Sequence, residues 1–310
     1  MINKIPMICV VGPTASGKTS LSIDIAQKYG GEIVSADSMQ IYKGIHIASA
    51  APDEQEKNGI PHHLIEFLEQ GDIFTVAEYV ALAGEKIIEV NSKNKLPVLV
   101  GGTGLYIDSL TENINFAPCD TDIELRNRLN TEMETLGVDY MLEKLSNIDP
   151  ETASRLHPNN KRRIIRALEV YEQTGKTFSQ LLIESKCYDT PYDTLFIGLT
   201  FEDREKLYAR IEKRIDIMLQ NGLLDEAYST YNNSCKGGAG QAIGHKELYP
   251  YFDGEISLDE AVENLKRATR RYAKRQLTWF KRNTEINWIY ADKCENAFIE
   301  AQKIIDEWRK

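Results

Sequence analysis

The sequence has few cysteines, and none of them lies in a metal-binding pattern. Its 310 residues include Cys9, Cys119, Cys187, Cys235 and Cys294, and no two of these are spaced as C-x-x-C. An odd number of scattered cysteines supports neither a disulfide framework nor a zinc site. It suits a reducing compartment. We therefore expect a cytoplasmic protein whose fold depends on an ordinary hydrophobic core.

Long apolar runs are absent as well. No stretch approaches the roughly 20 consecutive apolar residues of a membrane-spanning helix, so we expect no membrane association. The apolar residues Ile8–Val11 lead straight into glycines, and we expect a first strand there rather than a signal peptide. With 42% hydrophobic and 27% charged residues, the composition excludes long disordered tracts. A chain of this length can form one large unit and one smaller unit.

A positive net charge is also lacking, since the formal net charge is -10 at pH 7. The basic residues are nevertheless gathered locally. Lys266–Arg282 holds eight basic residues and Arg155–Arg166 holds five, and neither segment contains an acidic residue. Two such islands create a local positive field that the net charge hides, and together they favour a polyanionic partner over two solvated helix faces.

The strongest motif is Gly12–Thr19, which reads G-x-x-x-x-G-K-T directly after the apolar run Ile8–Val11. A strand, a glycine-rich turn and the start of a helix form the context of a phosphate-binding P-loop, in which backbone N–H groups converge on an anion. Lys18 would neutralise terminal phosphate oxygens, and the Thr19 hydroxyl would bind Mg²⁺. Loops of this type are common in nucleotide-binding and ATP-binding proteins.

The first hundred residues alternate strand and helix patterns. The predicted strands span residues 6–11, 32–36 and 96–100, and the predicted helices span 18–29 and 76–91. Because the strands are continuously apolar, we expect an α/β fold, a P-loop NTPase-like core with a parallel sheet and helices on both faces. Ligands of such sheets bind outside the carboxyl ends of the strands, so Gly12–Thr19, Asp37 and Gly101–Gly104 should converge on one cleft.

From about Asp122 the pattern becomes helical, and a strand pattern returns only at residues 195–201. The predicted helices of this stretch span residues 123–136, 140–146, 150–156 and 160–174. The later predicted elements are helices over 204–221, 223–231, 258–281 and 295–309 and a short strand over 286–290. We interpret the chain as an α/β core with C-terminal helices, residues 1–117 and 192–310, interrupted by a helical insertion domain, residues 118–191.

The acidic residue of a P-loop enzyme is missing from its usual place. A strand that ends in a carboxylate normally holds magnesium or aligns water, but Leu96–Val100 runs into Gly101–Gly104. Asp37 follows the strand predicted over 32–36 instead. It is a candidate magnesium carboxylate or general base facing a second substrate, and the alternative is a simple turn residue. Its position at the edge of the cleft favours the functional role.

The helix predicted over 258–281 separates its residues by face. Leu265, Tyr272 and Trp279 are seven residues apart and share one face, which we expect to pack in the core. Basic residues such as Lys274 lie nearly opposite and are available to a polyanion.

The adjacent histidines His62 and His63 are a weaker signal. Neighbouring residues point in different directions, and no third ligand lies near them in the sequence. We interpret them as hydrogen-bonded structural histidines rather than as a metal site.

Seven stretches, taken together and in this order, resemble the tRNA dimethylallyltransferase family, the isopentenyl transferases that modify an adenosine of the anticodon loop. They are GPTASGKT (Gly12–Thr19), SADSMQIYKG (Ser35–Gly44), GIPHHL (Gly59–Leu64), VGGTGLYI (Val100–Ile107), RLHPNNKRRIIRALEVYEQTGK (Arg155–Lys176), QAIGHKEL (Gln241–Leu248) and TRRYAKRQLTWF (Thr269–Phe280). Only the P-loop is widespread by itself. Jointly the stretches are highly specific, and they extend over nearly the whole chain.

The resemblance implies a reaction in which the P-loop holds the diphosphate of dimethylallyl diphosphate. The implied diphosphate-binding residues are Gly12, Pro13, Thr14, Ala15, Ser16, Gly17, Lys18 and Thr19. Lys18, Thr19 with its Mg²⁺, and Arg214, which matches a family arginine, would stabilise the charge of the departing diphosphate. Asp37 would take the proton of the exocyclic N6 amine of the adenosine 3′ of the anticodon.

The resemblance also implies that the adenine leaves the anticodon loop and enters a channel through the protein. The insertion domain would contact tRNA. The implied tRNA-binding residues are Asp37, Ser38, Met39, Gln40, Thr103, Arg126, Arg163, Arg166, Gln241, Lys246, Arg271 and Lys274. The expected cofactor is Mg²⁺, the expected partners are a tRNA anticodon stem-loop and dimethylallyl diphosphate, and the expected oligomeric state is a monomer.

The sequence departs from the family pattern at a few positions. The segment D-I-G-T-A-K-P is here HIASAAP, so Ala51 replaces a lysine. Asn160 replaces an aspartate in HPNN, and His245 replaces a tyrosine in QAIGH. None of these positions belongs to the implied catalytic set, and we expect activity to be retained.

Three other functions remain open at this point. A P-loop kinase of small molecules would bind ATP at Gly12–Thr19 and orient an acceptor hydroxyl with Asp37, but it leaves the basic islands unexplained. A non-catalytic RNA-binding protein gains nothing from a loop that activates diphosphate. An isoprenoid transferase that uses free adenosine monophosphate needs neither the helical insertion nor the basic islands. ATP turnover with a small acceptor would identify the kinase. Prenylation of free AMP would identify the isoprenoid transferase.

Overall fold

The structure is a computed structural model that describes residues 4–114, 122–185, 189–233 and 237–310. The chain forms two compact units, Met1–Thr111 with Thr190–Lys310, and Glu112–Asp189. The domain boundary that the sequence predicts between residues 117 and 118 lies outside the described residues. The boundary predicted between 191 and 192 falls where the chain enters a strand of the larger unit.

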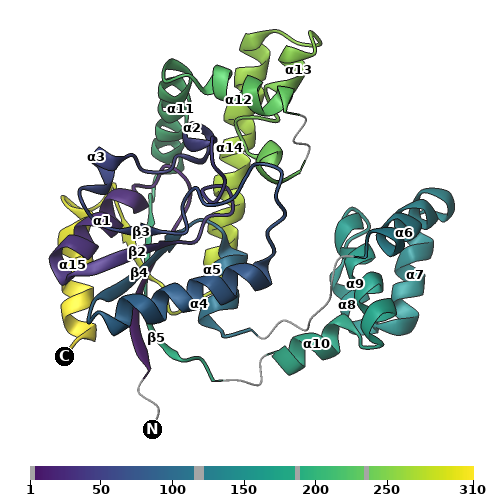
Figure 1. Ribbon diagram of the computed structural model, residues 1–310, viewed down its shortest axis with the longest axis horizontal. Coiled ribbons are helices and arrows are strands. Elements are labelled where there is room, and N and C mark those ends of the chain that lie inside the picture. Colours follow the sequence, from purple (N-terminus) through teal and green to yellow (C-terminus); the bar gives the residue numbers. More distant parts are fainter. Residues whose placement is uncertain (1–3, 115–121, 186–188, 234–236) are drawn as a thin grey trace. The chain divides into compact units, whose positions relative to one another are not determined.

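A six-stranded parallel sheet forms the core of the larger unit (Figure 1). Its strands are β1 (Ile5–Val11), β2 (Gly31–Ser35), β3 (His62–His63), β4 (Leu96–Gly101), β5 (Tyr192–Thr200) and β6 (Asn287–Tyr290), in the order β3-β2-β4-β1-β5-β6. Cys9 of β1 lies beside Leu99 of β4 and Phe196 of β5. This central position explains why β1 is apolar and buried along almost its whole length.

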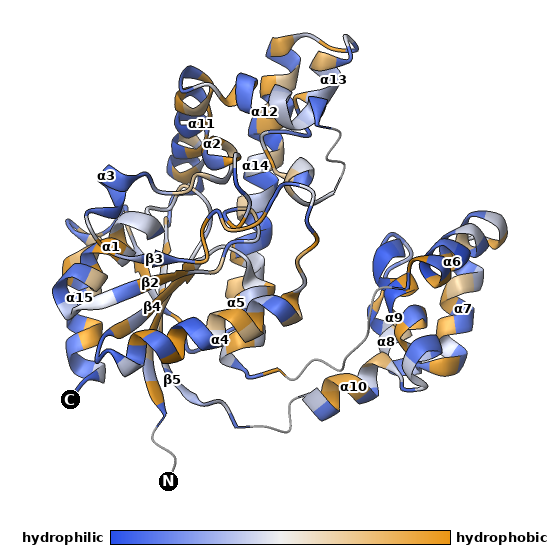
Figure 2. Ribbon diagram, viewed as in Figure 1, coloured by the Kyte–Doolittle hydropathy of each residue, from blue (hydrophilic) through white to orange (hydrophobic). Residues whose placement is uncertain are grey.

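Helices cover both faces of the sheet because the side chains of each strand alternate between them. Met7 and Cys9 pack against α4 (Val76–Ser92) and α5 (Gly104–Thr111). Ile8 and Val10 pack against α1 (Lys18–Tyr29) and α15 (Ala297–Trp308). Figure 2 shows the apolar strands between helices whose outer surfaces are polar. The predicted α/β class with a parallel sheet covered on both faces is confirmed.

Further helices pack together beyond the P-loop. They are α11 (Arg204–Gln220), α12 (Leu223–Asn232), α13 (Tyr249–Phe252) and α14 (Leu258–Phe280), with the short helices α2 (His46–Ser49), α3 (Glu54–Lys57) and η1 (Gly238–Gln241) nearby in the same unit. Apolar residues of α11 and α14, including Ile211, Ile215 and Leu265, form one buried cluster with Ala15 of the P-loop. Two helices distant in sequence are thereby fixed next to the loop that follows β1.

The described part of the second unit is helical. It consists of α6 (Ile123–Leu136), α7 (Val138–Ile148), α8 (Pro150–Arg155), α9 (Lys161–Thr174) and α10 (Phe178–Ser185). Leu129, Met141 and Leu168 belong to a buried core of its own. The side chains of Asp122 and Asp149 cap α6 and α8 by accepting backbone N–H bonds. None of the helices in the described ranges of either unit is long and apolar enough to cross a membrane.

The structure corrects several predicted elements. β5 begins at Tyr192 rather than at residue 195, because residues 192–194 pair with the start of β1 although they are not continuously apolar. The helices α5 and α10 are not predicted. In α5 the opening glycine conceals the helical spacing of Tyr106, Ile107 and Leu110, which are all buried.

Candidate active site

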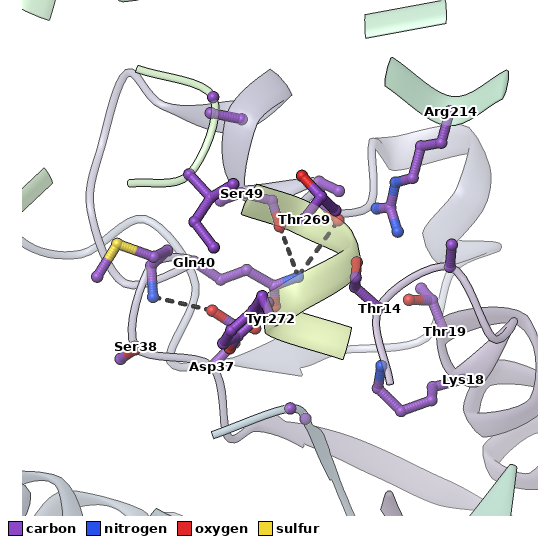
Figure 3. Close-up of a pocket in the computed structure, with 18 of the residues that line it drawn as sticks. Thr14, Lys18, Thr19, Asp37, Ser38, Gln40, Ser49, Arg214, Thr269 and Tyr272 are labelled. Atoms are coloured by element: carbon purple, nitrogen blue, oxygen red, sulfur yellow. Dashed lines mark hydrogen bonds between the residues drawn. The ribbon is translucent and has the colours of Figure 1, made fainter. Parts of the chain in front are cut away.

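A cavity of about 310 Å³ lies at the carboxyl ends of the strands. The loops after β1, β2 and β4 contribute Lys18, Asp37 and Gly102, while α11 and α14 contribute Arg214 and Tyr272. In the view of Figure 3, Lys18 and Arg214 lie on one side of the cavity and Asp37 lies on the other. The predicted convergence of the three strand-end segments on one cleft is confirmed.

The P-loop (Gly12–Thr19) has the backbone geometry of an anion-binding turn. Gly12 has φ +143°, and a Cβ there would lie 2.2 Å from the carbonyl oxygen of Leu199, so only glycine fits. Gly17 is left-handed at φ 99°, and α1 begins at Lys18. The N–H groups of the first helical turn have no intrahelical acceptor, and the helix dipole makes them attractive to an anion.

Two cationic side chains serve this loop, Lys18 of the loop itself and Arg214 of α11. Burial, and then the positive charge of Arg214, lower the pKa of the Lys18 ammonium from 10.5 to about 8, while Asp37 opposes the shift. Burial also lowers the pKa of Arg214, again opposed by Asp37. Lys18 Nζ donates to the carbonyl oxygen of Pro13 at 2.9 Å. A bound anion would relieve both the repulsion between the cations and the cost of their burial.

Asp37 lies in a turn that is tied to the loop after β4. Its Oδ1 accepts a hydrogen bond from the backbone N–H of Met39 at 2.9 Å. Thr103 Oγ1 accepts from the N–H of Ser38 at 3.0 Å, and the Thr103 N–H donates to Ala36 O at 3.1 Å. Asp37 is therefore both a turn residue and a half-buried carboxylate that lines the cavity.

Helices α11 and α14 add an apolar wall. The residues Ile211, Ile215, Met218 and Leu265 line the cavity. Tyr272 lies on the same face of α14 as Leu265, and its hydroxyl belongs to the polar part of the site. Burial and the charge of Asp37 raise the pKa of that hydroxyl, which keeps it protonated. The prediction that the row Leu265, Tyr272 and Trp279 packs in the core is wrong for Tyr272, which lines the cavity.

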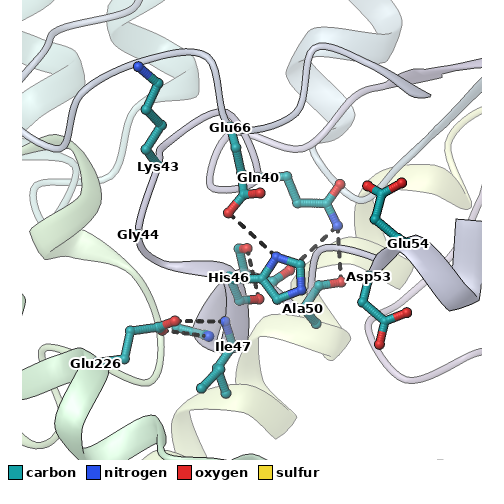
Figure 4. Close-up of polar contacts among 12 residues, drawn as sticks. Gln40, Lys43, Gly44, His46, Ile47, Ala50, Asp53, Glu54, Glu66 and Glu226 are labelled. Atoms are coloured by element: carbon teal, nitrogen blue, oxygen red, sulfur yellow. Dashed lines mark hydrogen bonds and ion pairs between the residues drawn. The ribbon is translucent and has the colours of Figure 1, made fainter. Parts of the chain in front are cut away.

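The wall formed by α2 is held in place by acidic and amide side chains (Figure 4). Glu226 accepts hydrogen bonds from two backbone N–H groups of α2, at 2.8 and 2.9 Å. Gln40 Nε2 donates to carbonyl groups at the end of the helix, at 3.3 and 3.5 Å. His46 pairs with Glu66 at 3.4 Å. The short helix is thereby connected to the loop after β2, to α12 and to the segment after β3.

Most of the residues that the sequence predicts for the site lie around this cavity. Those that line it are Thr14, Ala15, Lys18, Thr19, Asp37, Ser38, Met39, Gln40, Arg214, Gln241 and Lys246. Gly12, Pro13, Ser16, Gly17 and Thr103 belong to its loops without lining it. Arg271 and Lys274 are exposed on α14 and do not line the cavity.

The other three predicted tRNA contacts lie in the second unit. Arg163 is exposed, and Arg126 and Arg166 each donate to Oε2 of the buried Glu169 at 2.9 Å. Burial alone would raise the pKa of Glu169, but the bonds from the two arginines hold it below its ordinary value. The side chains of Arg126 and Arg166 are still 41% and 39% exposed. Two of the residues predicted to contact tRNA thus also hold α6 and α9 together within the insertion.

The sequence interpretation missed several residues of α14. Thr269, Tyr272, Arg275 and Gln276 all line the cavity. Leu265, Thr269, Tyr272 and Gln276 are spaced four, three and four residues apart, which places them on one helical face. This spacing extends the row of Leu265 and Tyr272, and it was the sequence signal that could have placed these residues at the site. The sequence interpretation followed the basic row of the helix instead.

The chemistry of the site fits Mg²⁺ only together with a ligand. Among the residues that the structure describes, no group of three or more His, Cys, Asp or Glu side chains could hold a metal. Thr19 lines the cavity at the second position of α1, where its hydroxyl can contribute one oxygen. Mg²⁺ characteristically takes one or two protein oxygens and completes its shell with phosphate oxygens and water. The residues present fit that arrangement.

The histidines are hydrogen-bonded, and two positions at which the sequence departs from the family pattern, His245 and Ala51, are buried. His63 Nε2 lies 2.7 Å from Glu32 Oε2, and His62 Nδ1 lies 2.8 Å from Ile60 O, which agrees with structural rather than metal-binding roles. His245 is fully buried and lies 3.0 Å from Glu226 Oε1. Ala51 is buried as well.

Comparison with protein families gives a match to the model described as IPP transferase, over residues 40–283. A tRNA dimethylallyltransferase of Bacillus subtilis is 48% identical over 287 residues, 92% of this chain and 91% of the relative. One of Caldanaerobacter subterraneus subsp. tengcongensis is 46% identical over 296 residues, 93% of this chain and 92% of the relative.

Two solved structures are similar as well. The tRNA isopentenylpyrophosphate transferase of Bacillus halodurans is 40% identical with a TM-score of 0.72, covering 98% of this chain and 96% of that chain. A eukaryotic dimethylallyltransferase described as acting on tRNA is 30% identical with a TM-score of 0.82, covering 97% and 78%. The similarity therefore extends over both units of the chain.

Proposed function

The chain belongs to the IPP transferase family, and from this premise we propose that it transfers the dimethylallyl group of dimethylallyl diphosphate to tRNA. The acceptor is the exocyclic N6 amine of the adenosine 3′ of the anticodon, and the products are N6-(dimethylallyl)adenosine and diphosphate. One observation carries the proposal. A single cavity presents a P-loop with its Lys18, the cation Arg214 of α11, and the carboxylate of Asp37, which follows β2 of the same sheet.

The P-loop side of the cavity would bind the leaving group. The bond between the allylic carbon and oxygen breaks, and its electron pair goes to the diphosphate. The N–H groups that open α1, together with Lys18 and Arg214, stabilise the charge that develops there, and such stabilisation is usually the largest catalytic contribution. Thr19 would hold Mg²⁺ together with the diphosphate oxygens, and the ion supplies further positive charge when bound.

Asp37 would act on the acceptor. The lone pair of the adenine amine forms the new bond to carbon, and the nitrogen then loses a proton, which the Asp37 carboxylate accepts. A positioned general base of this kind contributes roughly 10²–10⁴-fold to the rate. The apolar wall of Ile211, Ile215 and Met218 would surround the dimethylallyl group and exclude water from the allylic carbon.

The basic residues outside the cavity would hold the tRNA. Arg271 and Lys274 are exposed on α14, and Arg126, Arg163 and Arg166 lie in the insertion. We assign them to the phosphate backbone, where each contact adds about 0.7–0.9 to the slope of log affinity against log salt. Because one chain carries both the P-loop and Asp37, we assign the activity to the monomer. The scattered cysteines support a place in the cytoplasm.

Label transfer tests the proposed function. Purified protein is incubated with Mg²⁺, labelled dimethylallyl diphosphate and two anticodon stem-loops that differ only in the base 3′ of the anticodon. Label should enter the adenosine loop and not the guanosine loop. Free AMP serves as a third acceptor, and ATP with small acceptors tests a kinase. Absence of transfer to the adenosine loop, with phosphorylation of a small acceptor, would contradict the proposal.

A further inference from the structure

Gln276 joins two loops of the site that are distant in sequence. It lies on α14, and only 5% of it is exposed. Its Oε1 accepts a hydrogen bond from the backbone N–H of Thr14 in the P-loop at 2.8 Å. Its Nε2 donates to the carbonyl oxygen of Gly102, after β4, at 3.0 Å. A single amide therefore satisfies one donor and one acceptor on separate loops.

The fit around this amide is close. A Cβ added to Gly102 would lie 2.1 Å from Gln276 Nε2 and 3.9 Å from Asp37 Oδ2. Gly102 thus has no room for a side chain, because the amide of Gln276 occupies that space. The amide lies between the P-loop and the loop after β4, and Thr103 of that second loop is hydrogen-bonded to Ser38 and Ala36, on either side of Asp37.

The P-loop is held from a second direction as well. Arg210 Nε of α11 donates to the carbonyl oxygen of Ala15 at 2.9 Å. Ala15 has a left-handed backbone, with φ 61°, which a non-glycine residue keeps only where its surroundings hold it. The loop conformation therefore depends on side chains of α11 and α14 as well as on its own glycines.

We propose that Gln276 is a positioning residue, which sets the P-loop for diphosphate and fixes its distance from the Asp37 turn. Gln276 acts through the backbone of these loops, because its amide oxygen accepts from one of them and its amide nitrogen donates to the other. The inference rests on the proposed function, since it concerns the same diphosphate site. It predicts that loss of the amide impairs use of the diphosphate substrate more than use of tRNA.

Two substitutions separate the bonds. Gln276→Met keeps the length of the side chain and removes the hydrogen bonds to Thr14 and Gly102, together with a side-chain bond to the neighbouring Tyr272. Gln276→Glu keeps an acceptor for the Thr14 N–H but turns a second acceptor toward the carbonyl oxygen of Gly102. Only a protonated carboxyl, whose O–H can donate, restores the hydrogen bond to Gly102. The matched control is Trp279→Phe, which removes a 2.8 Å bond from α14 to Asp108 without affecting the P-loop.

Calorimetry with Mg²⁺ and inorganic pyrophosphate measures the effect directly. Without the bonds to Thr14 and Gly102 the free P-loop can leave its binding geometry, and the cost of restoring that geometry should weaken pyrophosphate binding to Gln276→Met about tenfold. Gln276→Glu should bind more weakly still near neutral pH, and its deficit relative to Gln276→Met should shrink at acidic pH. In steady-state transfer, the KM for dimethylallyl diphosphate should rise while the KM for the stem-loop is unchanged. Trp279→Phe should bind pyrophosphate like the unmodified protein, even where its thermal midpoint is lower.

Each outcome bears on the inference. Pyrophosphate binding by Gln276→Met equal to that of the unmodified protein overturns it, as does an equal loss in Trp279→Phe. If Gln276→Met fails to fold, the affinity of Gln276→Glu relative to the unmodified protein decides in its place: a deficit that does not shrink at acidic pH overturns the inference. If the unmodified protein does not bind pyrophosphate, the proposed function fails together with the inference. If it does bind and Gln276→Met is unimpaired, the inference alone fails.

Discussion

The half-buried Lys18 predicts a pH dependence of anion binding. Burial and Arg214 lower its pKa from 10.5 to about 8 in the free protein. A bound diphosphate would favour the charged form and hold the ammonium protonated. Diphosphate binding then requires Lys18 to be protonated, and the free protein loses this proton as the pH rises through about 8.

Linkage gives the magnitude of this effect. About nine-tenths of Lys18 is protonated at pH 7 and about one-tenth at pH 9, so affinity for pyrophosphate should fall about tenfold between them. The effect on stability follows from the same shift. Between about 8 and 10.5, the unfolded chain binds more protons at this group than the folded chain does, so stability rises with pH across that window. The buried charge thus destabilises the free protein at neutral pH.

Calorimetry in two buffers of different ionisation enthalpy measures the proton taken up on binding. At pH 9, Lys18 should take up about 0.9 proton for each pyrophosphate bound, in addition to any proton that the ligand itself takes up. Lys18→Arg is the matched control, because a guanidinium does not titrate in this range and the ligand contributes equally to both proteins. Equal proton uptake by the two proteins would refute the reasoning.

Further predictions concern one residue each. Arg214→Gln should lower the rate of label transfer about 10²–10³-fold, as the loss of a donor to developing negative charge does; a change below threefold in single-turnover assays would argue against its role. Glu169→Gln should destabilise the insertion by about 1.5–3 kcal/mol, because it weakens charge-assisted bonds to Arg126 and Arg166; an unchanged urea midpoint would contradict this. Gly12→Ala should be more destabilising than Gly30→Ala by thermal unfolding, since a Cβ at Gly30 meets nothing within 4 Å; equal midpoints would exclude the clash with Leu199.

The sheet and the P-loop could be predicted because local signals agree with the fold. Continuous apolar runs identify β1 and β4, and glycines with a lysine identify the loop. β5 was predicted too short because Tyr192–Thr194 become a strand only by pairing with β1. The glycine that opens α5 conceals a helix, and tertiary packing of its apolar residues overrides that propensity.

The cavity was only partly predictable. Motifs identify Lys18 and Asp37, since loops at the ends of parallel strands meet at one edge of a sheet. The helical spacing shared with Leu265 and Tyr272 could place Gln276 on the cavity face, but its role depends on contacts with residues 262 and 174 positions away. Likewise, the buried Glu169 is recognisable only once α6 and α9 are packed together.

The most direct test compares binding and chemistry in Asp37→Ala. Pyrophosphate affinity is measured with Mg²⁺, and label transfer to the adenosine stem-loop is measured under single-turnover conditions. We predict that affinity stays near that of the unmodified protein while transfer falls by roughly 10²–10⁴-fold. Transfer at the unmodified rate would contradict a cavity in which Asp37 acts on the amine of adenine while the P-loop holds the diphosphate.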